Sequence, residues 1–370
     1  MDIYESGKRA TDEETRAPPQ SRPIEPEIAS SCRDRESATI GDRHVTDCPE
    51  NMPSANSDHC VIAIAQIAPV WLDRAATLAK MIEKIREAGQ SGVRMLCFGE
   101  AMLPGYPFWV EHTDGARFES SLQKEFFAHY VDQAVDIANG DLGALCNAAR
   151  QAHLWVVMGC IERDKQRGQS VFASLVTIDE SGEIRNVHRK LMPTYEERLV
   201  WSPGDGAGLN TFQLDRFHLG GLNCWENWMP LARSALYAQG EDLHVAVWPG
   251  NAHNTKLITP FIAREGRSFA LSACSLMRRE DIPAHIPYAD LLRERLPAVS
   301  ANGGSCMAGP DGEWIIPPRV DDEVLLIAEI DHARVREERQ NFDAFGHYSR
   351  PDVLELHVDR RRRSGAAFMK

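Results

Sequence analysis

The chain has 370 residues, of which 43% are hydrophobic and 26% are charged, an ordinary composition for a globular protein with one large core or two modest ones. Its formal net charge of −13 argues against nonspecific binding to nucleic acid or to anionic membranes, so the expected partner is a small molecule or another copy of the chain. The longest nearly apolar run, residues 61–72, contains Gln66 and Pro69 and is shorter than the roughly 20 residues of a membrane span. The N-terminus lacks the basic start and apolar core of a secretory signal. These features predict a cytoplasmic protein that does not span a membrane.

Composition also predicts three segments. Residues 1–58 are rich in Glu, Asp, Arg, Ser and Pro with little apolar patterning, which predicts a disordered N-terminal extension. The folded domain is predicted at 59–357. A basic tail at 358–370 contains the run Arg360 to Arg363, which is typical of a solvated segment.

From residue 60 onward, strand-like and helix-like patterns alternate along the chain. Strands are predicted at 61–67, 93–98, 154–161, 172–178, 219–223, 243–248, 271–275 and 324–330, and helices around 78–85, at 142–153 and 229–239, and near 258–269. Apolar strands of this kind need cover on both faces. The pattern therefore predicts an α/β fold with sheets between helix layers. The segment 278–297 follows no pattern that we can assign, and a role in specificity or in an interface is open.

The nine cysteines show neither paired CxxC spacing nor the density of a disulfide scaffold. Most are predicted to be reduced and to pack as small core residues, as for Cys97, Cys160 and Cys274 in their apolar runs. No HExxH or other metal-ligand spacing occurs in the sequence. We therefore expect no metal and no cofactor.

Cys224 differs from the other cysteines because an apolar, Gly-rich run carries it to the start of a predicted helix. Unpaired backbone N–H groups and the positive end of a helix dipole lower the pKa of a cysteine from its free value of about 8.5. The position therefore predicts a nucleophile with a lowered pKa.

Two further ionisable residues lie at the ends of predicted strands: Glu100 within 98–107 and Lys190 within 188–194. Taken singly, such residues are usually a solvated carboxylate, a surface ammonium and, for Cys224, a packed thiol. The three residues occur in this order along the chain, each within an extended sequence motif. Together they make the sequence resemble the nitrilase superfamily of carbon–nitrogen hydrolases over roughly residues 60–357. The motifs at residues 224–227 and 229–233 are similar to those of the true nitrilase branch.

The resemblance implies a four-layer α-β-β-α sandwich that hydrolyses a small nitrile with water and assembles as a homodimer or a larger, possibly spiral, homo-oligomer. It also implies that Glu197 matches a second family glutamate, which positions the lysine and the substrate. Glu196 is the rival of Glu197 by adjacency alone.

Hydrolysis of a nitrile or amide requires a nucleophile, a proton shuttle and a group that stabilises developing charge. We expect Glu100 to take the thiol proton, Cys224 to form a covalent thioimidate and then a thioester, and Lys190 to stabilise charge on the nitrogen. Glu100 then activates water twice. The backbone N–H of Trp225 is an expected additional donor.

Aromatic residues near these motifs suggest the substrate. Tyr106, Trp225 and Trp248 are predicted to line the pocket, which favours an aryl or arylaliphatic nitrile. A cyanide-converting enzyme or an aliphatic amidase with the same three residues remains an alternative. From other classes, a catalytically inactive scaffold or a redox-sensing cysteine protein also remains open.

Overall fold

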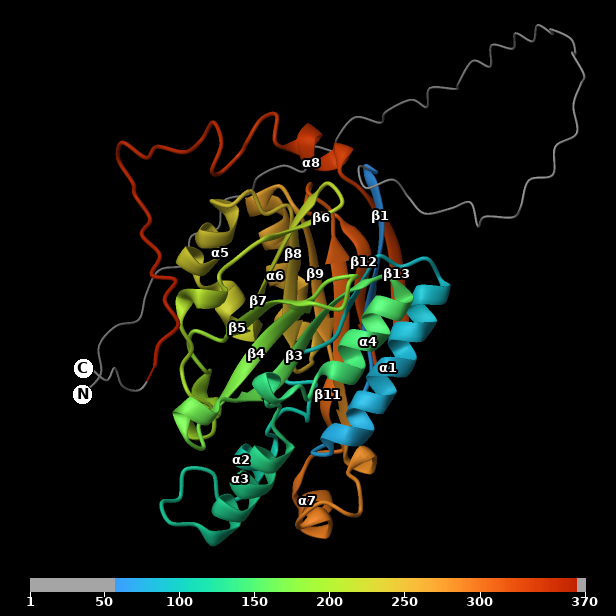
Figure 1. Ribbon diagram of the computed structural model, residues 1–370, viewed down its shortest axis with the longest axis vertical. Helices are drawn as coiled ribbons and strands as arrows, with labels where there is room; N and C mark the ends of the chain where they lie inside the picture. The colour runs from blue at the N-terminus through green and yellow to red at the C-terminus, as the bar shows by residue number, and fades with distance from the viewer. Residues whose placement is uncertain (1–56, 365–370) are drawn as a thin grey trace, which may run out of the picture. The chain divides into compact units, whose positions relative to one another are not determined.

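The computed structural model describes residues 57–364. Two sheets pack face to face, and helices cover their outer faces (Figure 1). The predicted disordered extension lies outside the described residues, apart from Ser57 and Asp58. Within the part of the chain that is described, no helix has the length and apolarity to cross a membrane.

The first sheet has the strand order β13-β1-β2-β3-β4-β5. Its strands are β1 His59–Gln66, β2 Met95–Cys97, β3 Trp155–Arg163, β4 Val171–Ile178, β5 Ile184–Arg189 and β13 Val324–Asp331. Strands β1, β2 and β3 are parallel, whereas β4, β5 and β13 pair with their neighbours antiparallel. Because β13 pairs along the whole of β1, the two ends of the domain meet in one sheet.

The second sheet has the order β10-β11-β9-β8-β7-β6, and β12 pairs with β11. Its strands are β6 Phe212–Leu214, β7 Phe217–Asn223, β8 Leu243–Trp248, β9 Phe269–Cys274, β10 Leu276–Arg278, β11 Val299–Ala308 and β12 Trp314–Val320. Here β7, β8 and β9 are parallel. Their carboxyl ends therefore meet at one edge of the sheet, where loops can assemble a site.

The helices are α1 Arg74–Gln90, α2 Trp109–His112, α3 Ser121–Gln133, α4 Gly143–Ala152, α5 Pro230–Tyr237, α6 Ala252–Gly266, α7 Ala289–Arg295 and α8 Ala333–Glu338. Short 3₁₀ turns are η1 Ile137–Asn139, η2 Lys165–Arg167, η3 Tyr195–Leu199, η4 Gly206–Gly208, η5 Cys224–Trp228 and η6 Arg279–Asp281. Helices α1 and α4 lie side by side over the first sheet (Figure 1).

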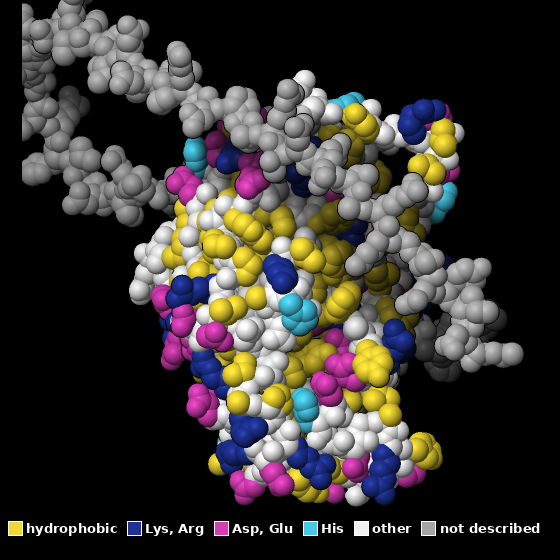
Figure 2. Space-filling view, turned by 180° about the vertical axis from the view of Figure 1, so that it is seen from behind, with side chains coloured by type: hydrophobic (Ala, Val, Ile, Leu, Met, Phe, Trp, Pro, Cys, Tyr) yellow, Lys and Arg dark blue, Asp and Glu magenta, His cyan; other side chains and the backbone are white. Residues whose placement is uncertain are grey.

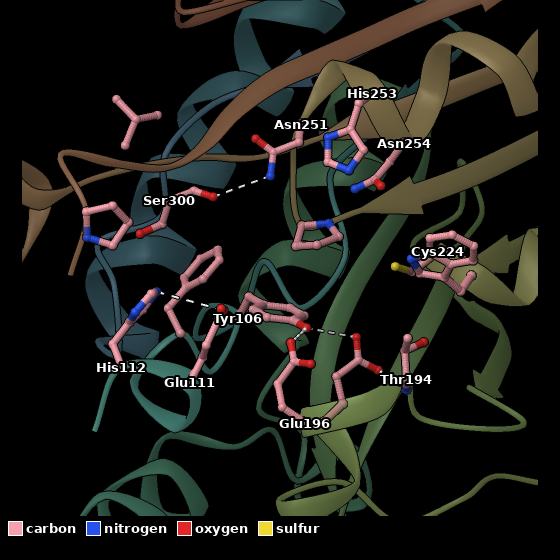
Figure 3. A pocket seen from close by; sticks show the side chains of 16 residues that line it. Tyr106, Glu111, His112, Thr194, Glu196, Cys224, Asn251, His253, Asn254 and Ser300 are labelled. Carbon is pink, nitrogen blue, oxygen red and sulfur yellow. Dashed lines mark hydrogen bonds and ion pairs between the residues drawn. The ribbon is translucent and has the colours of Figure 1, made fainter. Parts of the chain in front are cut away.

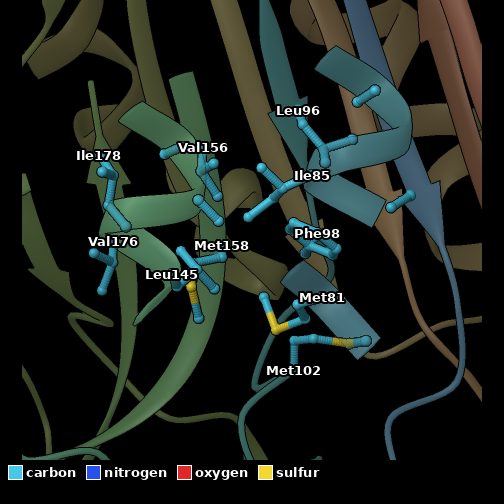
Figure 4. Close-up of a cluster of buried hydrophobic side chains, with 14 of the residues drawn as sticks. Met81, Ile85, Leu96, Phe98, Met102, Leu145, Val156, Met158, Val176 and Ile178 are labelled. Atoms are coloured by element: carbon cyan, nitrogen blue, oxygen red, sulfur yellow. The ribbon is translucent and has the colours of Figure 1, made fainter. Parts of the chain in front are cut away.

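Alternation along the strands builds the layers, since successive side chains of a strand point to opposite faces. In β2 and the residue after it, Leu96 and Phe98 pack against α1 and α4, together with Met81, Ile85 and Leu145 (Figure 4). Their neighbours Met95 and Cys97 point the other way, into the core between the sheets, where Val245, Val247 and Leu271 meet them. Helix α6 closes the far side of the second sheet with Ile258 and Ile262. The predicted four-layer α-β-β-α sandwich is confirmed.

The predicted elements are present with shifted ends. Helix α6 begins at Ala252, six residues before the start predicted from its apolar residues. The unassigned segment 278–297 contains η6 and α7, and its side chains Ile282, Leu292 and Leu296 are buried against the aromatic cluster of α2 and α3. That segment is thus part of the core beside the site.

Part of the predicted basic tail is held against the domain. Arg362 pairs with Asp205 at 3.1 Å and donates to the carbonyl of Val187 at 2.7 Å, and the backbone N–H of Arg363 also donates to Asp205. The interpretation of this run as merely solvated is therefore wrong for Arg362. Its guanidinium forms an ion pair with the Asp205 carboxylate, which is almost fully buried.

All seven cysteines among the described residues are free, and six of them are buried. This matches the expected core roles of Cys97, Cys160 and Cys274. Cys224 is also buried, but it lies at a cavity, as described next.

Candidate active site

Three loops at the edge of the sandwich carry the ionisable residues singled out by the sequence. Glu100 lies three residues after β2, Lys190 directly follows β5, and Cys224 directly follows β7. Strands β2 and β5 belong to the first sheet and β7 belongs to the second. The site is therefore assembled from both sheets, at their common edge.

The structure brings Glu100, Lys190, Glu197 and Cys224 together. Lys190 Nζ donates to Glu100 Oε1 at 2.8 Å and to Glu197 Oε2 at 2.7 Å, and all three side chains are at most 2% exposed. Cys224 Sγ and a carboxylate oxygen of each glutamate lie within 4.8 Å of one another. A thiol, an acid–base group and a cation thus face one small volume, the arrangement that covalent hydrolysis of an acyl or nitrile carbon requires.

The geometry separates Glu197 from its neighbour Glu196. Glu197 accepts the backbone N–H of Thr194 at 2.6 Å as well as the lysine, so the start of η3 fixes its carboxylate. Glu196 Oε1 instead contacts the Tyr106 hydroxyl at 3.0 Å, which also contacts Glu197 Oε1 at 3.0 Å. Glu197 is therefore the second partner of Lys190, and Glu196 faces the cavity.

Two close approaches hold the Glu100 loop. The backbone N–H of Glu100 donates to the carbonyl of Trp248, at the end of β8, at 3.1 Å. Gly159 of β3 lies directly beneath the loop, where a Cβ atom would come within 2.6 Å of Glu100 Cα and 2.5 Å of Ala101 N. A residue without a side chain at 159 therefore allows the carboxylate to reach the lysine.

Cys224 has a left-handed backbone conformation, with φ of 49°, which is unusual for a residue with a side chain and is often found at functional turns. Asn227 supports this turn by donating its side-chain amide to the carbonyl of Cys224 at 2.9 Å. His244 Nε2 contacts Asn227 Oδ1 at 2.7 Å, and Glu241 Oε1 contacts His244 Nδ1 at 2.9 Å. The sequence interpretation missed this buried support, although a histidine and a glutamate in or beside an apolar strand were a usable signal.

The predicted lowering of the Cys224 pKa is wrong. Burial raises the pKa of the thiol well above its ordinary value, and the negative charges of Glu100 and Glu197 add to this effect. Lys190 and the backbone N–H of Trp225 act in the opposite direction and are outweighed. The helix that begins at Cys224 is one short 3₁₀ turn, so its dipole is small. This environment favours the neutral thiol of Cys224, which would need a base to react as a nucleophile.

Glu100 has the properties of that base. Burial raises its pKa from 4.5 to about 7, although Lys190 partly opposes this rise. Its Oε2 atom is buried without a hydrogen-bond partner among the described residues, which leaves an oxygen free to accept a proton. For Lys190, burial disfavours the charged form, but the charges of Glu100, Cys224 and Glu197 outweigh it and raise the pKa of the ammonium. These shifts favour a protonated Lys190 beside a Glu100 whose raised pKa suits proton exchange.

Glu100, Glu197 and Cys224 offer ligand types that a metal ion accepts, and their atoms are close enough to hold one. The ammonium of Lys190, however, bonds both carboxylates. The residues present therefore supply their own cation at the place where a metal ion would have to bind.

A cavity of about 470 Å³ opens onto the thiol. Figure 3 shows the Cys224 sulfur pointing into it, with Tyr106, Glu196 and Thr194 on the wall opposite Asn251, His253 and Asn254. The other lining residues are Phe108, Glu111, His112, Glu197, Trp225, Pro249, Pro297, Val299 and Ser300. The lining of the cavity therefore combines aromatic rings with polar and acidic side chains.

Of the three predicted substrate-binding residues, Tyr106 and Trp225 line this cavity and Trp248 does not. The Trp248 side chain is fully buried, and its indole N–H donates to Ser272 Oγ at 3.1 Å between the second sheet and α6. Its contribution to the site is its carbonyl, which holds the Glu100 loop. A tryptophan at the end of an apolar strand gives no sequence signal that distinguishes these two roles.

Comparisons with known proteins agree with this geometry. The family model described as carbon-nitrogen hydrolase matches residues 61–340. The chain is 37% identical to a protein named nitrilase 2 from an unknown prokaryotic organism, covering 83% of this chain and 95% of that protein. It is 36% identical to an aliphatic nitrilase of Sinorhizobium fredii (strain HH103), covering 82% and 96%, and 33% identical to nitrilase 2 of Arabidopsis thaliana, covering 86% and 95%.

Solved structures share the fold at lower identity. A double mutant of the amidase from Nesterenkonia sp. AN1 in complex with acrylamide is similar with a TM-score of 0.59 and 17% identity, covering 79% of this chain and 97% of that one. The NitFhit protein of C. elegans is similar with a TM-score of 0.63 and 17% identity, covering 84% and 69%.

The chain therefore belongs to the carbon–nitrogen hydrolase family, a class of hydrolases that the sandwich and its buried Glu-Lys-Cys site already indicated. Within that family it belongs to the nitrilase branch, because its relatives at 36–37% identity over more than four fifths of the chain are nitrilases.

Proposed function

We propose that this protein is a nitrilase that hydrolyses an organic nitrile to the carboxylic acid and ammonia through a covalent intermediate on Cys224. The observation that carries the proposal is the buried Lys190 ammonium held between Glu100 and Glu197, all within reach of one thiol. The similarity to aliphatic nitrilases supports a nitrile as the substrate.

In the first half of the reaction, Glu100 accepts the thiol proton while sulfur bonds to the nitrile carbon. The proton then passes to the nitrogen, which gives a thioimidate. Lys190 faces the nitrogen as negative charge develops there, and the backbone N–H of Trp225 is a second donor. Electrostatic stabilisation of this kind is strong because the site is buried.

In the second half, Glu100 removes a proton from water as the water oxygen bonds to the same carbon. Return of that proton to the nitrogen gives a tetrahedral carbon that carries a hydroxyl and an amino group. As the carbon–nitrogen bond breaks, Glu100 transfers the hydroxyl proton to the nitrogen, so ammonia leaves and the carbonyl of a thioester forms. A second water attacks in the same way, the carbon–sulfur bond breaks, and the carboxylic acid leaves as Cys224 regains its proton. One carboxyl group thus acts alternately as base and acid, a task suited to a pKa near 7.

The cavity supports an aryl or arylaliphatic nitrile as the preferred substrate. Tyr106 and Phe108 lie with ring centroids 4.9 Å apart, and both line the cavity with Trp225. Aromatic walls favour flat apolar substituents through burial and ring contacts. A volume of about 470 Å³ is in the range of sites for small ligands.

Matched panels of nitriles and their amides test the proposal. Ammonia and carboxylate release should be measured with benzonitrile, phenylacetonitrile and butyronitrile, with the three corresponding amides, and with inorganic cyanide. We expect release from the nitriles, with the aromatic members turned over faster, and none from Cys224→Ser. Release from the amides alone indicates an amidase, release from cyanide alone a cyanide-converting enzyme, and release from none a scaffold.

We also propose that the chain assembles as a homo-oligomer. Exposed apolar side chains follow one another along η5, α5 and α6, and we take them together as a patch: Trp228, Met229 between η5 and α5, Leu231, Leu257 and Phe261. The rings of Trp228 and Phe261 stack with centroids 6.5 Å apart. Figure 2 shows that hydrophobic side chains gather on the face turned away from the viewer in Figure 1. Such patches are typical of interfaces.

Sedimentation velocity tests this assembly. We expect the wild type to sediment as a dimer or larger species. Leu231→Glu with Phe261→Glu should shift it towards the monomer, whereas Phe118→Glu, at an exposed apolar residue outside the patch, should not. A wild type that is monomeric at micromolar concentration contradicts the proposal.

A further inference from the structure

We infer that Glu226 is a positioning residue that joins the loop of Lys190 to the loop of Cys224 and so sets the relative placement of the cation and the nucleophile. This inference rests on the proposed function. Glu226 does not touch the cavity and has no part in the steps described above.

One carboxylate makes both connections. Glu226 Oε1 accepts the backbone N–H of Leu191 at 2.8 Å, and Oε2 accepts the backbone N–H of Asn223 at 2.9 Å. Leu191 directly follows Lys190, and Asn223 directly precedes Cys224. His188 Nε2 contacts Oε2 at 2.9 Å and completes the set.

The two loops come from different sheets, which makes such a link necessary. Lys190 follows β5 of the first sheet and Cys224 follows β7 of the second. Apolar side chains fill the space between the sheets, and apolar contact is not directional. Hydrogen bonds fix distance and angle, so Glu226 can specify how the two strand ends lie relative to each other.

Capping of η5 alone does not explain these contacts. Glu226 is the third residue of that 3₁₀ turn, and its bond to Asn223 closes the start of the turn. Its partners Leu191 and His188, however, lie 35 and 38 residues away in the sequence. A cap needs only the local bond, whereas a link between loops needs both.

The Glu226 carboxylate that forms this link is ionised and buried away from solvent. Glu226 is 1% exposed. Burial alone raises the pKa of this carboxyl, but His188 and the two backbone N–H groups outweigh burial and lower it. Hydrogen bonds to an ionised carboxylate are roughly twice as strong as neutral ones, which suits a group that must hold two strand ends in place.

Glu226→Gln tests the inference because the amide has a single acceptor oxygen and cannot accept from both loops as the carboxylate does. Asp242→Asn is the matched control. Asp242 is also a buried carboxylate that accepts a backbone N–H, from His218 at 2.7 Å, and contacts a histidine, His332, at 3.0 Å. It precedes β8 and so lies at the end of that strand opposite to the site.

With benzonitrile as substrate, we expect kcat of Glu226→Gln to fall by about 10²-fold while KM changes by less than about threefold, because the reacting groups are misplaced but the cavity is intact. The melting temperature of Asp242→Asn should fall by about as much as that of Glu226→Gln, while its kcat stays within about threefold of the wild-type value. The inference is overturned if Glu226→Gln keeps its kcat, or if the two variants lose kcat in proportion to their melting temperatures.

Two further measurements cover the remaining outcomes. If Glu226→Gln does not fold, Glu226→Asp tests the link in its place. This variant keeps the negative charge beside His188, but its side chain is one methylene too short to accept hydrogen bonds from both loops. We expect at least a tenfold loss of kcat, about 1.4 kcal/mol in the barrier, and full activity of Glu226→Asp refutes the link.

If the wild type turns over no nitrile, the proposed function fails separately. The rate of Cys224 alkylation by iodoacetamide, followed by peptide mass spectrometry, still reports how Glu100 and Lys190 are placed around the thiol. We expect this rate to fall at least about tenfold in Glu226→Gln and to stay unchanged in Asp242→Asn. Equal rates in the wild type and Glu226→Gln contradict the inference.

Discussion

Lys190 Nζ and Glu100 Oε1 lie 2.8 Å apart, although 90 residues separate them in the sequence and both side chains are only 1% exposed. Glu197 shares the same ammonium at 2.7 Å. One cation therefore holds two carboxylates in a buried site, and both the stability and the chemistry of that site depend on it.

Lys190→Met should destabilise the fold by about 3–5 kcal/mol at neutral pH, because two buried carboxylates lose their counter-charge. Since Lys190 lowers the pKa of Glu100, its removal raises that pKa further above the unfolded value. The native state then binds more protons than the unfolded state, so stability falls as pH rises.

Urea unfolding at about pH 5 and pH 7 should therefore show a larger loss at the higher pH. Lys190→Arg, which keeps the charge, serves as the control and should lose less stability at pH 7. An equal loss at both pH values for Lys190→Met argues that the ammonium does not compensate the carboxylates.

The raised pKa of Glu100 predicts the pH dependence of turnover. A general base must be ionised, so kcat/KM should rise with pH and level off above the pKa of about 7. Ionisation of the Cys224 thiol adds no further change to the profile of kcat/KM below pH 7, because burial keeps the pKa of the thiol high. Initial rates with benzonitrile across this range test the prediction, and an acid limb centred near 4.5 contradicts the environment that we describe for Glu100.

Gly159→Ala should disturb the base without touching the cavity. Its Cβ would come within 2.5–2.6 Å of the Glu100 loop, so the loop must move, and we expect kcat to fall by about 10²-fold. Gly143→Ala is the control, because a Cβ at this first residue of α4 meets nothing within 4 Å. It should leave kcat unchanged, and differential scanning calorimetry should show no loss of stability. Full activity of Gly159→Ala shows that the loop tolerates displacement.

The cavity should discriminate against negatively charged nitriles. Glu111 and Glu196 line it together with Glu197, and the described lining residues include no lysine or arginine. We expect kcat/KM for 4-cyanobenzoate to be at least about tenfold below that for 4-methylbenzonitrile, because like charges repel across a narrow site. The difference should shrink in Glu196→Gln, and an unchanged ratio assigns the discrimination to other groups.

The layers and the converging loops were predictable because they depend on local patterns. Continuous apolar runs identified β1, β2 and β3, and strand ends identified the positions of Glu100, Lys190 and Cys224. The state of the thiol was not predictable, because its pKa depends on burial and on carboxylates distant in the sequence. The same limit applies to Trp248, whose apolar run fits a core and a pocket equally well, and to Glu226, whose partners lie 35 and 38 residues away.

Every step of the proposed reaction depends on a covalent bond between Cys224 and the nitrile carbon. Intact mass spectrometry during turnover of phenylacetonitrile measures this directly, with Cys224→Ala treated in parallel. We expect a mass increase equal to the thioimidate or the thioester on the wild type, with no adduct and no ammonia from Cys224→Ala. Continued ammonia production by Cys224→Ala would contradict the assignment of Cys224 as the nucleophile.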